Sequence, residues 1–365
     1  MTRAASQLDW SSKRATRKGF SMAVMIGNSQ KSFTAAVLAL IFTASIAFSQ
    51  SAKAGTSFGG VLTEIADVPM PGPAVRFDYQ SLDAEHGQLY ISHMNANQLI
   101  VFDTKTQQVV ANLDGFMRVH GVLAVPEIGR VYASVTGDRK VAAVDMQTLK
   151  ILGTSGPVTY PDGLAYSPAA KRIFVSDEHG GVDAVIDTAN NKLLASIPLG
   201  GGAGNTVYDP DSGHILVAVH GKNDLVSIDP ASMKIVSRSP LPGIRNPHGI
   251  ALDLDSRLAF IAGEENHSLA VFDLKTMKLL TVQQVGDDPD VLAFDPGLKR
   301  LYVSAESGNV SVFQERDGAV RLLGQFEMPH AHTVAVDPVT HLVYFPLENV
   351  GGRPLLRIMK PTSLP

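Results

Sequence analysis

Hydrophobic and polar residues alternate along most of this chain in short runs, and clusters of turn-forming residues separate the runs. One stretch reads VHGVLAV, PEIG, RVYAS, VTGDR and KVAAVD, and the same order of runs returns many times. Alternation with a period of two is typical of β-strands that have one buried face, and Gly, Pro, Asp and Asn clusters between such runs are typical of tight turns. The pattern therefore predicts an all-β protein.

The alternating pattern repeats seven times in one frame of 16 residues. The frames begin 42 residues apart five times and 44 residues apart once, at Phe77, Val119, Pro161, Ala203, Pro247, Pro289 and Ala331. Periods of about 40–45 residues with several short strands per unit are typical of β-propeller blades. We therefore predict one seven-bladed β-propeller of four-stranded blades.

The two ends of the repeat region are complementary. The last repeat ends in RPLLRIMKP and supplies fewer outer strands than the others, whereas the strand GVLTEIADVPM precedes the first repeat without a place in it. We expect this N-terminal strand to complete the seventh blade and to close the ring, since closure removes exposed sheet edges.

An acidic residue recurs at the end of the third strand of five repeats, where we expect it to cap the backbone of the next turn. These residues are Asp103, Asp145, Asp187, Asp229 and Asp273.

The repeats resemble the YVTN or YncE-like family of seven-bladed propellers. The phrases that carry the resemblance are YISH, YASV, FVSD, FIAG and YVSA, together with VFDTKT, AVDMQT and VFDLKT. The resemblance covers nearly the whole chain after the leader and implies the fold, but no activity, because this architecture supports unrelated functions. The family's Asn after Y-V-T is absent, and the residues in its place are His93, Val135, Asp177, Val219, Gly263, Ala305 and Leu347.

Residues 1–54 are typical of a secretory leader. Lys31 precedes an apolar run from Phe33 to Phe48, and Ala52-Lys53-Ala54 follows as a cleavage signal of the A-x-A type. The apolar run is shorter than the roughly 20 residues that span a bilayer as a helix. We therefore expect cleavage near Ala54, and a periplasmic or secreted mature protein of residues 55–365 with no transmembrane anchor.

Charge and composition exclude several classes of function. The leader holds seven of the 31 basic and one of the 35 acidic residues, so the mature chain carries a formal net charge of about −10. A nucleic-acid partner is disfavoured, since such binding depends on clustered Lys and Arg. The chain has no cysteine, which excludes disulfides, thiolate metal sites and covalently attached haem. It also has no P-loop, G-x-S-x-G or H-E-x-x-H motif, so neither a nucleotide cofactor nor a serine or zincin mechanism is supported.

The second position of the frame is His or Asp in six of the seven repeats. In a propeller the first strand of each blade lines the central channel, so this position should form one ring around one mouth of the channel. The ring reads Asp78, His120, Asp162, Gly204, His248, Asp290 and His332. Its lack of Ser, Thr, Asn, Gln and Lys favours a functional ring over a merely polar one. Gly204 leaves a gap, which we interpret as a lax loop, with a ligand entrance as the alternative.

Further acids and histidines follow the second strands. Because successive strands are antiparallel, these residues should lie on the same face as the ring. They are His93, Glu178, His220, Glu264, Glu306 and Glu348.

Neutral imidazoles beside carboxylates suit a divalent metal ion, without favouring one metal. We predict His120, His248, His332 and His330 as metal ligands; His330 lies two residues before His332 and would share its side of an extended strand. The predicted ligand-binding residues are Asp78, Asp162, Asp290, Glu178, Glu306, Glu348, His93 and His220. If the protein is an enzyme, Glu264 and His248 are the catalytic candidates.

Three functions remain open at this point. The first is a binding module that holds a metal ion or a small charged ligand in the axial funnel. The second is a metal-assisted hydrolase, lactonase or lyase, in which the metal polarises a carbonyl or activates water. The third is a protein-interaction scaffold that uses a face of the propeller and has no chemistry.

Overall fold

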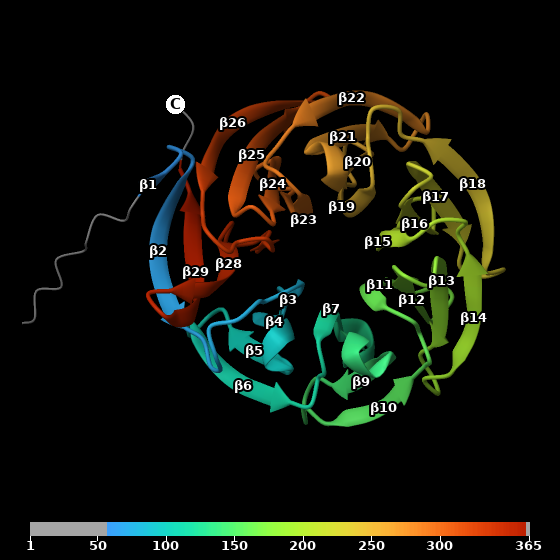
Figure 1. Ribbon diagram of the computed structural model, residues 1–365, viewed down its shortest axis with the longest axis horizontal. Helices are drawn as coiled ribbons and strands as arrows, with labels where there is room; N and C mark the ends of the chain where they lie inside the picture. The colour runs from blue at the N-terminus through green and yellow to red at the C-terminus, as the bar shows by residue number, and fades with distance from the viewer. Residues whose placement is uncertain (1–56, 363–365) are drawn as a thin grey trace, which may run out of the picture. The chain divides into compact units, whose positions relative to one another are not determined.

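Seven antiparallel β-sheets surround a central axis in the computed structural model of the protein, which describes residues 57–362 (Figure 1). This arrangement confirms the predicted seven-bladed β-propeller. The predictions for the leader and its cleavage site lie outside the described residues. Within residues 57–362 no helix is long and apolar enough to cross a membrane.

Six blades have four strands each, and each blade is continuous in sequence. The first three blades are β3 Gln80–Asp83, β4 Gln88–His93, β5 Gln98–Asp103 and β6 Gln108–Asp114; β7 Val119–Val125, β8 Arg130–Val135, β9 Lys140–Asp145 and β10 Ile151–Ser155; and β11 Pro161–Ser167, β12 Arg172–Asp177, β13 Val182–Asp187 and β14 Leu193–Pro198. The next three are β15 Ala203–Asp209, β16 His214–Val219, β17 Asp224–Asp229 and β18 Lys234–Pro240; β19 Pro247–Asp253, β20 Leu258–Gly263, β21 Ser268–Asp273 and β22 Lys278–Gln284; and β23 Pro289–Asp295, β24 Arg300–Ala305, β25 Asn309–Arg316 and β26 Ala319–Glu327. Single-turn 3₁₀ helices occur at η1 Met94–Ala96, η2 Pro126–Ile128, η3 Thr136–Asp138 and η4 Glu264–Asn266.

The seventh blade combines both ends of the described chain. Its strands, from the axis outwards, are β27 Ala335–Val336, β28 Val343–Val350, β29 Arg353–Pro361, β2 Leu62–Pro69 and the short β1 Ser57–Phe58. Strand β2 pairs antiparallel with β29, and Arg357 of β29 forms a two-pronged ion pair with Asp67 of β2 at 2.8 and 2.6 Å. The predicted closure by the N-terminal strand is thus confirmed, with β1 as one additional edge strand.

The hydrophobic core is divided among the blade interfaces. Seven clusters of buried side chains join neighbouring blades, and the cluster of blades one and two also includes Val291 of blade six. The cluster across the closure packs Val61 and Leu62 with Phe345 and Tyr302. The outer turns are held locally: Asp103 accepts hydrogen bonds from the backbone N–H groups of Lys105 and Thr106 at 2.9 and 2.7 Å. Asp145, Asp187, Asp229 and Asp273 make equivalent bonds, which confirms the predicted capping role.

A bulge at the start of the first strand positions the axial side chains. In blades two to six the register between first and second strands shifts after the first pair; Pro161 pairs with Asp177, for example, and Leu164 with Val175. Bulges bend a strand and redirect a side chain. The third frame position next to this bulge is often glycine, and a Cβ atom at Gly249 would lie 1.9 Å from the carbonyl oxygen of Asp290. These glycines allow neighbouring first strands to approach closely around the axis.

Candidate functional site

A cavity of about 250 Å³ lies on the axis, where first strands begin and second strands end. Its lining residues are Arg76, Asp78, Tyr79, Met94, Arg118, His120, Tyr160, Asp162, Glu178, His248, Glu264, Asp290 and Glu306. Five members of the predicted ring therefore line one cavity, although they come from five different blades. The cavity carries six carboxylates and two arginines, so its charge is dominated by acids.

The carboxylates at the bottom of the cavity are almost fully buried. Asp78, Asp162 and Asp290 are 2, 3 and 6% exposed. Burial raises the pKa of Asp78 to about 6, although Arg76 acts in the opposite direction. Burial and the nearby acids also raise the pKa values of Asp162 and Asp290. Burial disfavours the charged form of a carboxyl group. A cation bound beside this cluster would therefore stabilise the charged carboxylates.

Arg76 is the internal cation of the cluster. Its Nη2 atom lies 2.6 Å from Oε1 of Glu306 and 3.9 Å from a carboxylate oxygen of both Asp78 and Asp290. One guanidinium thus offsets part of the charge on three carboxylates. Among residues 57–362 neither an arginine nor a lysine pairs with Asp162, which instead accepts a hydrogen bond from the Tyr79 hydroxyl at 3.2 Å.

His248 lies between the buried acids and the rim of the cavity. Its Nε2 atom is 3.1 Å from the Tyr79 hydroxyl, 3.5 Å from Asp290 and 3.7 Å from Asp162. On the other side of the ring its Nδ1 atom is 3.1 Å from Nε2 of His220 and 3.2 Å from Oε1 of Glu264. One edge of this imidazole therefore faces acids, and the other edge faces two potential metal ligands.

His220, His248 and Glu264 offer three ligand atoms that lie within 4.8 Å of one another. Burial lowers the pKa of His220 to about 3 and also lowers that of His248, so both imidazoles are neutral near pH 7. Burial raises the pKa of Glu264 to about 7. The second oxygen of Glu264 accepts a hydrogen bond from Asn246 at 2.6 Å, which fixes the orientation of the carboxylate.

Gly204 makes this triad sterically feasible. A Cβ atom at Gly204 would lie 3.0 Å from Nε2 of His220 and 2.8 Å from Cα of His248. The segment before it is packed as tightly, because the His220 N–H donates to the Gly202 carbonyl at 2.8 Å and a Cβ at Gly201 would overlap the His220 carbonyl. The prediction of a lax loop at this gap is therefore wrong: the space left by the missing side chain adjoins the His220 imidazole.

A second group of possible ligands comprises Asp78, Asp290 and His332, whose ligand atoms also lie within 4.8 Å of one another. All three residues are buried, and Nε2 of His332 has no hydrogen-bond partner among the described residues. Burial lowers the pKa of His332 to about 3. This group lies beside Arg76, whose positive charge opposes a metal ion there, whereas no arginine contacts the triad of His220, His248 and Glu264 within the described chain.

The four histidines predicted as ligands do not form one cluster. His120 contacts the Tyr160 hydroxyl at 3.0 Å and the Arg118 carbonyl at 2.7 Å, and burial lowers its pKa to about 4. His330 does not share a side with His332, because its φ of 69° places it in a turn before β27 rather than on an extended strand. Its side chain is 45% exposed and pairs with Glu348 at 2.7 Å. Neither His330 nor Glu348 lines the axial cavity.

Two other predicted ligand-binding residues lie beside the cavity rather than on its wall. His93 is fully buried and stacks on Phe77 at a centroid distance of 4.0 Å, while its Nε2 atom contacts the Val75 carbonyl. His220 reaches the site through His248. Glu178 and Glu306 do line the cavity, as expected.

Arg76, Tyr79, Arg118 and Tyr160 were not predicted from the sequence. Arg76, Arg118 and Tyr160 lie just before a repeated frame begins, so the frame does not include them. Tyr79 stands at the third frame position, where three other repeats carry glycine, so the frame does not mark it as functional. An arginine two residues before an acidic ring position was the one available signal, in the segment Arg76-Phe77-Asp78.

Comparisons with known proteins agree with the fold. No family model matches the chain. One curated relative is Antigen Lp49 of Leptospira interrogans, 23% identical over 226 residues, which are 62% of this chain and 41% of the antigen. The chain thus spans about two fifths of the length of this relative.

Two solved structures are similar across most of both chains. Hydrazine synthase of Kuenenia stuttgartiensis superposes with a TM-score of 0.67 at 17% identity, over 87% of this chain and 99% of the other. A streptogramin B lyase structure superposes with a TM-score of 0.70 at 12% identity, over 84% of this chain and 100% of the other. At these identities the similarity concerns the β-propeller fold, and activity has to be argued from the site itself.

Proposed function

We propose that this protein is an exported β-propeller that binds a divalent transition-metal ion in its axial cavity through His220, His248 and Glu264. The observation that carries the proposal is the convergence of two neutral imidazoles and one carboxylate on a point at the cavity wall, with their donor atoms 3.1 and 3.2 Å apart.

The spacing of these atoms suits a metal of the zinc type. Zn–N and Zn–O bonds of about 2.0–2.1 Å set neighbouring ligands of a tetrahedron about 3.3 Å apart. The two measured separations are close to this value. Two histidines and one glutamate would leave a fourth position open toward the cavity, which is the arrangement of zinc sites that accept an exogenous ligand.

The surroundings of the triad also support metal binding. A histidine that coordinates a metal usually donates its other ring N–H to a carboxylate or another acceptor, which orients the ring. His248 meets this requirement, since its Nε2 faces Tyr79, Asp290 and Asp162. A bound cation would also offset the charge of the acids whose pKa values burial raises.

Metal analysis of the purified mature protein tests the proposal. We expect one transition-metal ion per chain, its removal by a chelator, and its loss in His248→Ala and in His220→Ala. The matched control is His86→Ala, whose side chain is 59% exposed and pairs with Asp83 away from the cavity. Loss of metal in His332→Ala with retention in His220→Ala would instead assign the ion to Asp78, Asp290 and His332.

A metal-assisted hydrolase, lactonase or lyase is the second candidate. Glu264 favours it, because a carboxyl group with a pKa of about 7 is suited to exchange a proton near neutral pH. The structurally similar streptogramin B lyase and hydrazine synthase are enzymes by name. Turnover of a panel of lactones and esters that is lost on chelation and restored by metal would support this reading, and its absence would leave the binding function.

Export and family membership are part of the proposal. The leader pattern of residues 1–54 supports cleavage near Ala54 and a periplasmic or secreted protein. The phrases YISH, YVSA and VFDTKT support a place in the YVTN or YncE-like family. N-terminal sequencing of the protein secreted from a full-length gene tests the cleavage site directly.

A further inference from the structure

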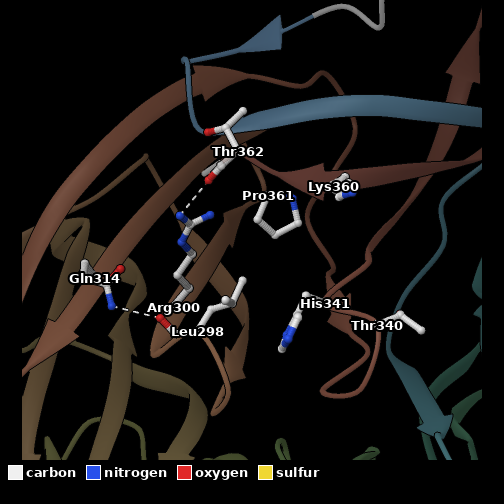
Figure 2. Close-up of a pocket in the computed structure, with 8 residues that line it drawn as sticks. All are labelled: Leu298, Arg300, Gln314, Thr340, His341, Lys360, Pro361 and Thr362. Atoms are coloured by element: carbon white, nitrogen blue, oxygen red, sulfur yellow. Dashed lines mark hydrogen bonds between the residues drawn. The ribbon is translucent and has the colours of Figure 1, made fainter. Parts of the chain in front are cut away.

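A second pocket lies between the sixth and seventh blades, away from the axial cavity. Its volume is about 380 Å³, and its lining includes Arg300 of β24, His341 before β28, Lys360 of β29 and Thr362 just after β29. Figure 2 shows the Arg300 side chain along one side of the pocket, with His341 and Lys360 on the opposite side. Two cationic side chains and one imidazole thus surround one hollow.

Arg300 stands at a repeated position of the propeller. Arg130 and Arg172 occupy the same place at the start of the second strand in blades two and three. In both, Nη1 donates to a carbonyl oxygen just after the third strand of the next blade, that of Thr188 for Arg130 and those of Pro230 and Ala231 for Arg172. These two arginines therefore connect neighbouring blades.

Arg300 makes this connection only in part. Its Nη2 atom donates to the Thr362 carbonyl at 2.9 Å, but Nε and Nη1 are buried and have no hydrogen-bond partner among the described residues. Among the described residues, no side-chain nitrogen of Arg130 or Arg172 is both buried and without a hydrogen-bond partner. Thr362 corresponds to Thr188 of blade three, and it follows Pro361, which stands where blades three and four carry Asp187 and Asp229.

The guanidinium of Arg300 is also without an ion-pair partner. The residue is 4% exposed, and no carboxylate lies within 4.0 Å of it among residues 57–362. The nearby acid Asp295 is already engaged: it pairs with His341 at 2.9 Å and accepts the backbone N–H groups of Gly297 and Leu298. A buried charge with unused donors is costly unless an anion or another acceptor meets it.

We propose that this pocket binds a small oxyanion, of the phosphate or carboxylate type, on the free Nε and Nη1 donors of Arg300, with Lys360 as the second cation. Two adjacent guanidinium N–H groups form a fork that matches two oxygens of a phosphate or carboxylate. Lys360 is exposed and adds charge at the rim. His341 closes the side of the pocket and is held there by its contact with Asp295.

Calorimetric titration with inorganic phosphate and, separately, with succinate tests the site. The protein is treated with chelator and the ionic strength is held constant with chloride. We expect saturable binding of one anion per chain, at least tenfold weaker in Arg300→Gln and about fivefold weaker in Lys360→Gln, the size of one exposed ion pair. Preferred binding of phosphate or of succinate identifies the type of oxyanion.

Two controls separate this site from the rest of the molecule. Arg172→Gln removes an equivalent inter-blade arginine, and His248→Ala disrupts the axial triad. Both variants should leave anion binding at the second pocket unchanged. Lys360→Gln changes an exposed side chain, so it gives an answer even if Arg300→Gln does not fold. The proposal is overturned if neither anion binds in the millimolar range, or if Arg172→Gln or His248→Ala weakens binding as much as Lys360→Gln.

Discussion

Nδ1 of His248 lies 3.1 Å from Nε2 of His220, although the two histidines belong to adjacent blades. His248 is the second residue of a first strand, and His220 follows a second strand. They meet because Gly204, the ring residue of the fourth blade, has no side chain: a Cβ there would lie 3.0 Å from Nε2 of His220 and 2.8 Å from Cα of His248. The gap in the ring is therefore part of the candidate metal site.

Metal affinity should depend on pH through Glu264. Its pKa of about 7 in the metal-free protein means that binding below pH 7 must displace a proton from this carboxyl group, whereas both histidines of the triad are already neutral. Affinity should rise with pH up to about 7, and Glu264→Gln should remove about tenfold per pH unit from this dependence. Competition titrations with a chromophoric chelator measure it. An unchanged slope in Glu264→Gln would contradict the assignment.

Asp162→Asn should stabilise the metal-free protein at pH 8. Burial raises the pKa of Asp162 in the folded state above its unfolded value, so folding favours the protonated form and stability is lost as pH rises. The neutral amide avoids this loss and still accepts a hydrogen bond from Tyr79. We expect a gain of about 1–3 kcal/mol in the free energy of unfolding at pH 8, and a smaller gain at pH 5. Urea titrations at both values decide this, and a destabilised variant at pH 8 would refute it.

Gly204→Ala should disrupt the triad more than it disrupts the fold. The added Cβ would approach Nε2 of His220 to 3.0 Å and the Pro247 carbonyl to 2.7 Å. We expect a cost of about 1–3 kcal/mol in stability together with loss of bound metal. Gly153→Ala in β10 is the control, because the nearest atom there is the flexible side-chain amide of Asn191 at 3.0 Å. Full metal occupancy in folded Gly204→Ala would show that the triad does not hold the ion.

Removal of β2 should open the ring. A chain that starts at Met70 lacks Val61 and Leu62 in the closing core cluster and exposes the edge of β29. Exposed edges pair with other chains, so we expect aggregation in light scattering. Asp67→Asn keeps the strand and only weakens its ion pair with Arg357, at a cost of about 1 kcal/mol or less. A monomeric, folded chain from Met70 would contradict the role of β2.

The repeat made the fold and the ring predictable. Units of constant length place the same frame position at the same height in each blade, so Asp78, His120, Asp162, His248 and Asp290 could be assigned to one cavity without any structure. The closing role of β2 followed from the same count of strands. These features depend on chain connectivity and periodicity, which the sequence states directly.

Contacts across the axis could not be predicted in this way. The frame does not reveal that His330 adopts a left-handed conformation, or that His93 turns toward Phe77 rather than toward the cavity. Nor does it reveal which histidine meets which acid, because that depends on the direction of each side chain. The triad joins residues that the sequence had placed in three separate roles: His220 as a ligand-binding residue, His248 as a metal ligand and catalytic candidate, and Glu264 as a catalytic candidate.

Anomalous X-ray scattering at the absorption edge of the bound metal tests the central claim most directly. In crystals of the mature protein supplied with zinc, we expect one peak at about 2.0–2.2 Å from Nε2 of His220, Nδ1 of His248 and an oxygen of Glu264. A peak between Asp78, Asp290 and His332 would contradict the account. So would the absence of a peak in the axial cavity of crystals soaked in excess zinc.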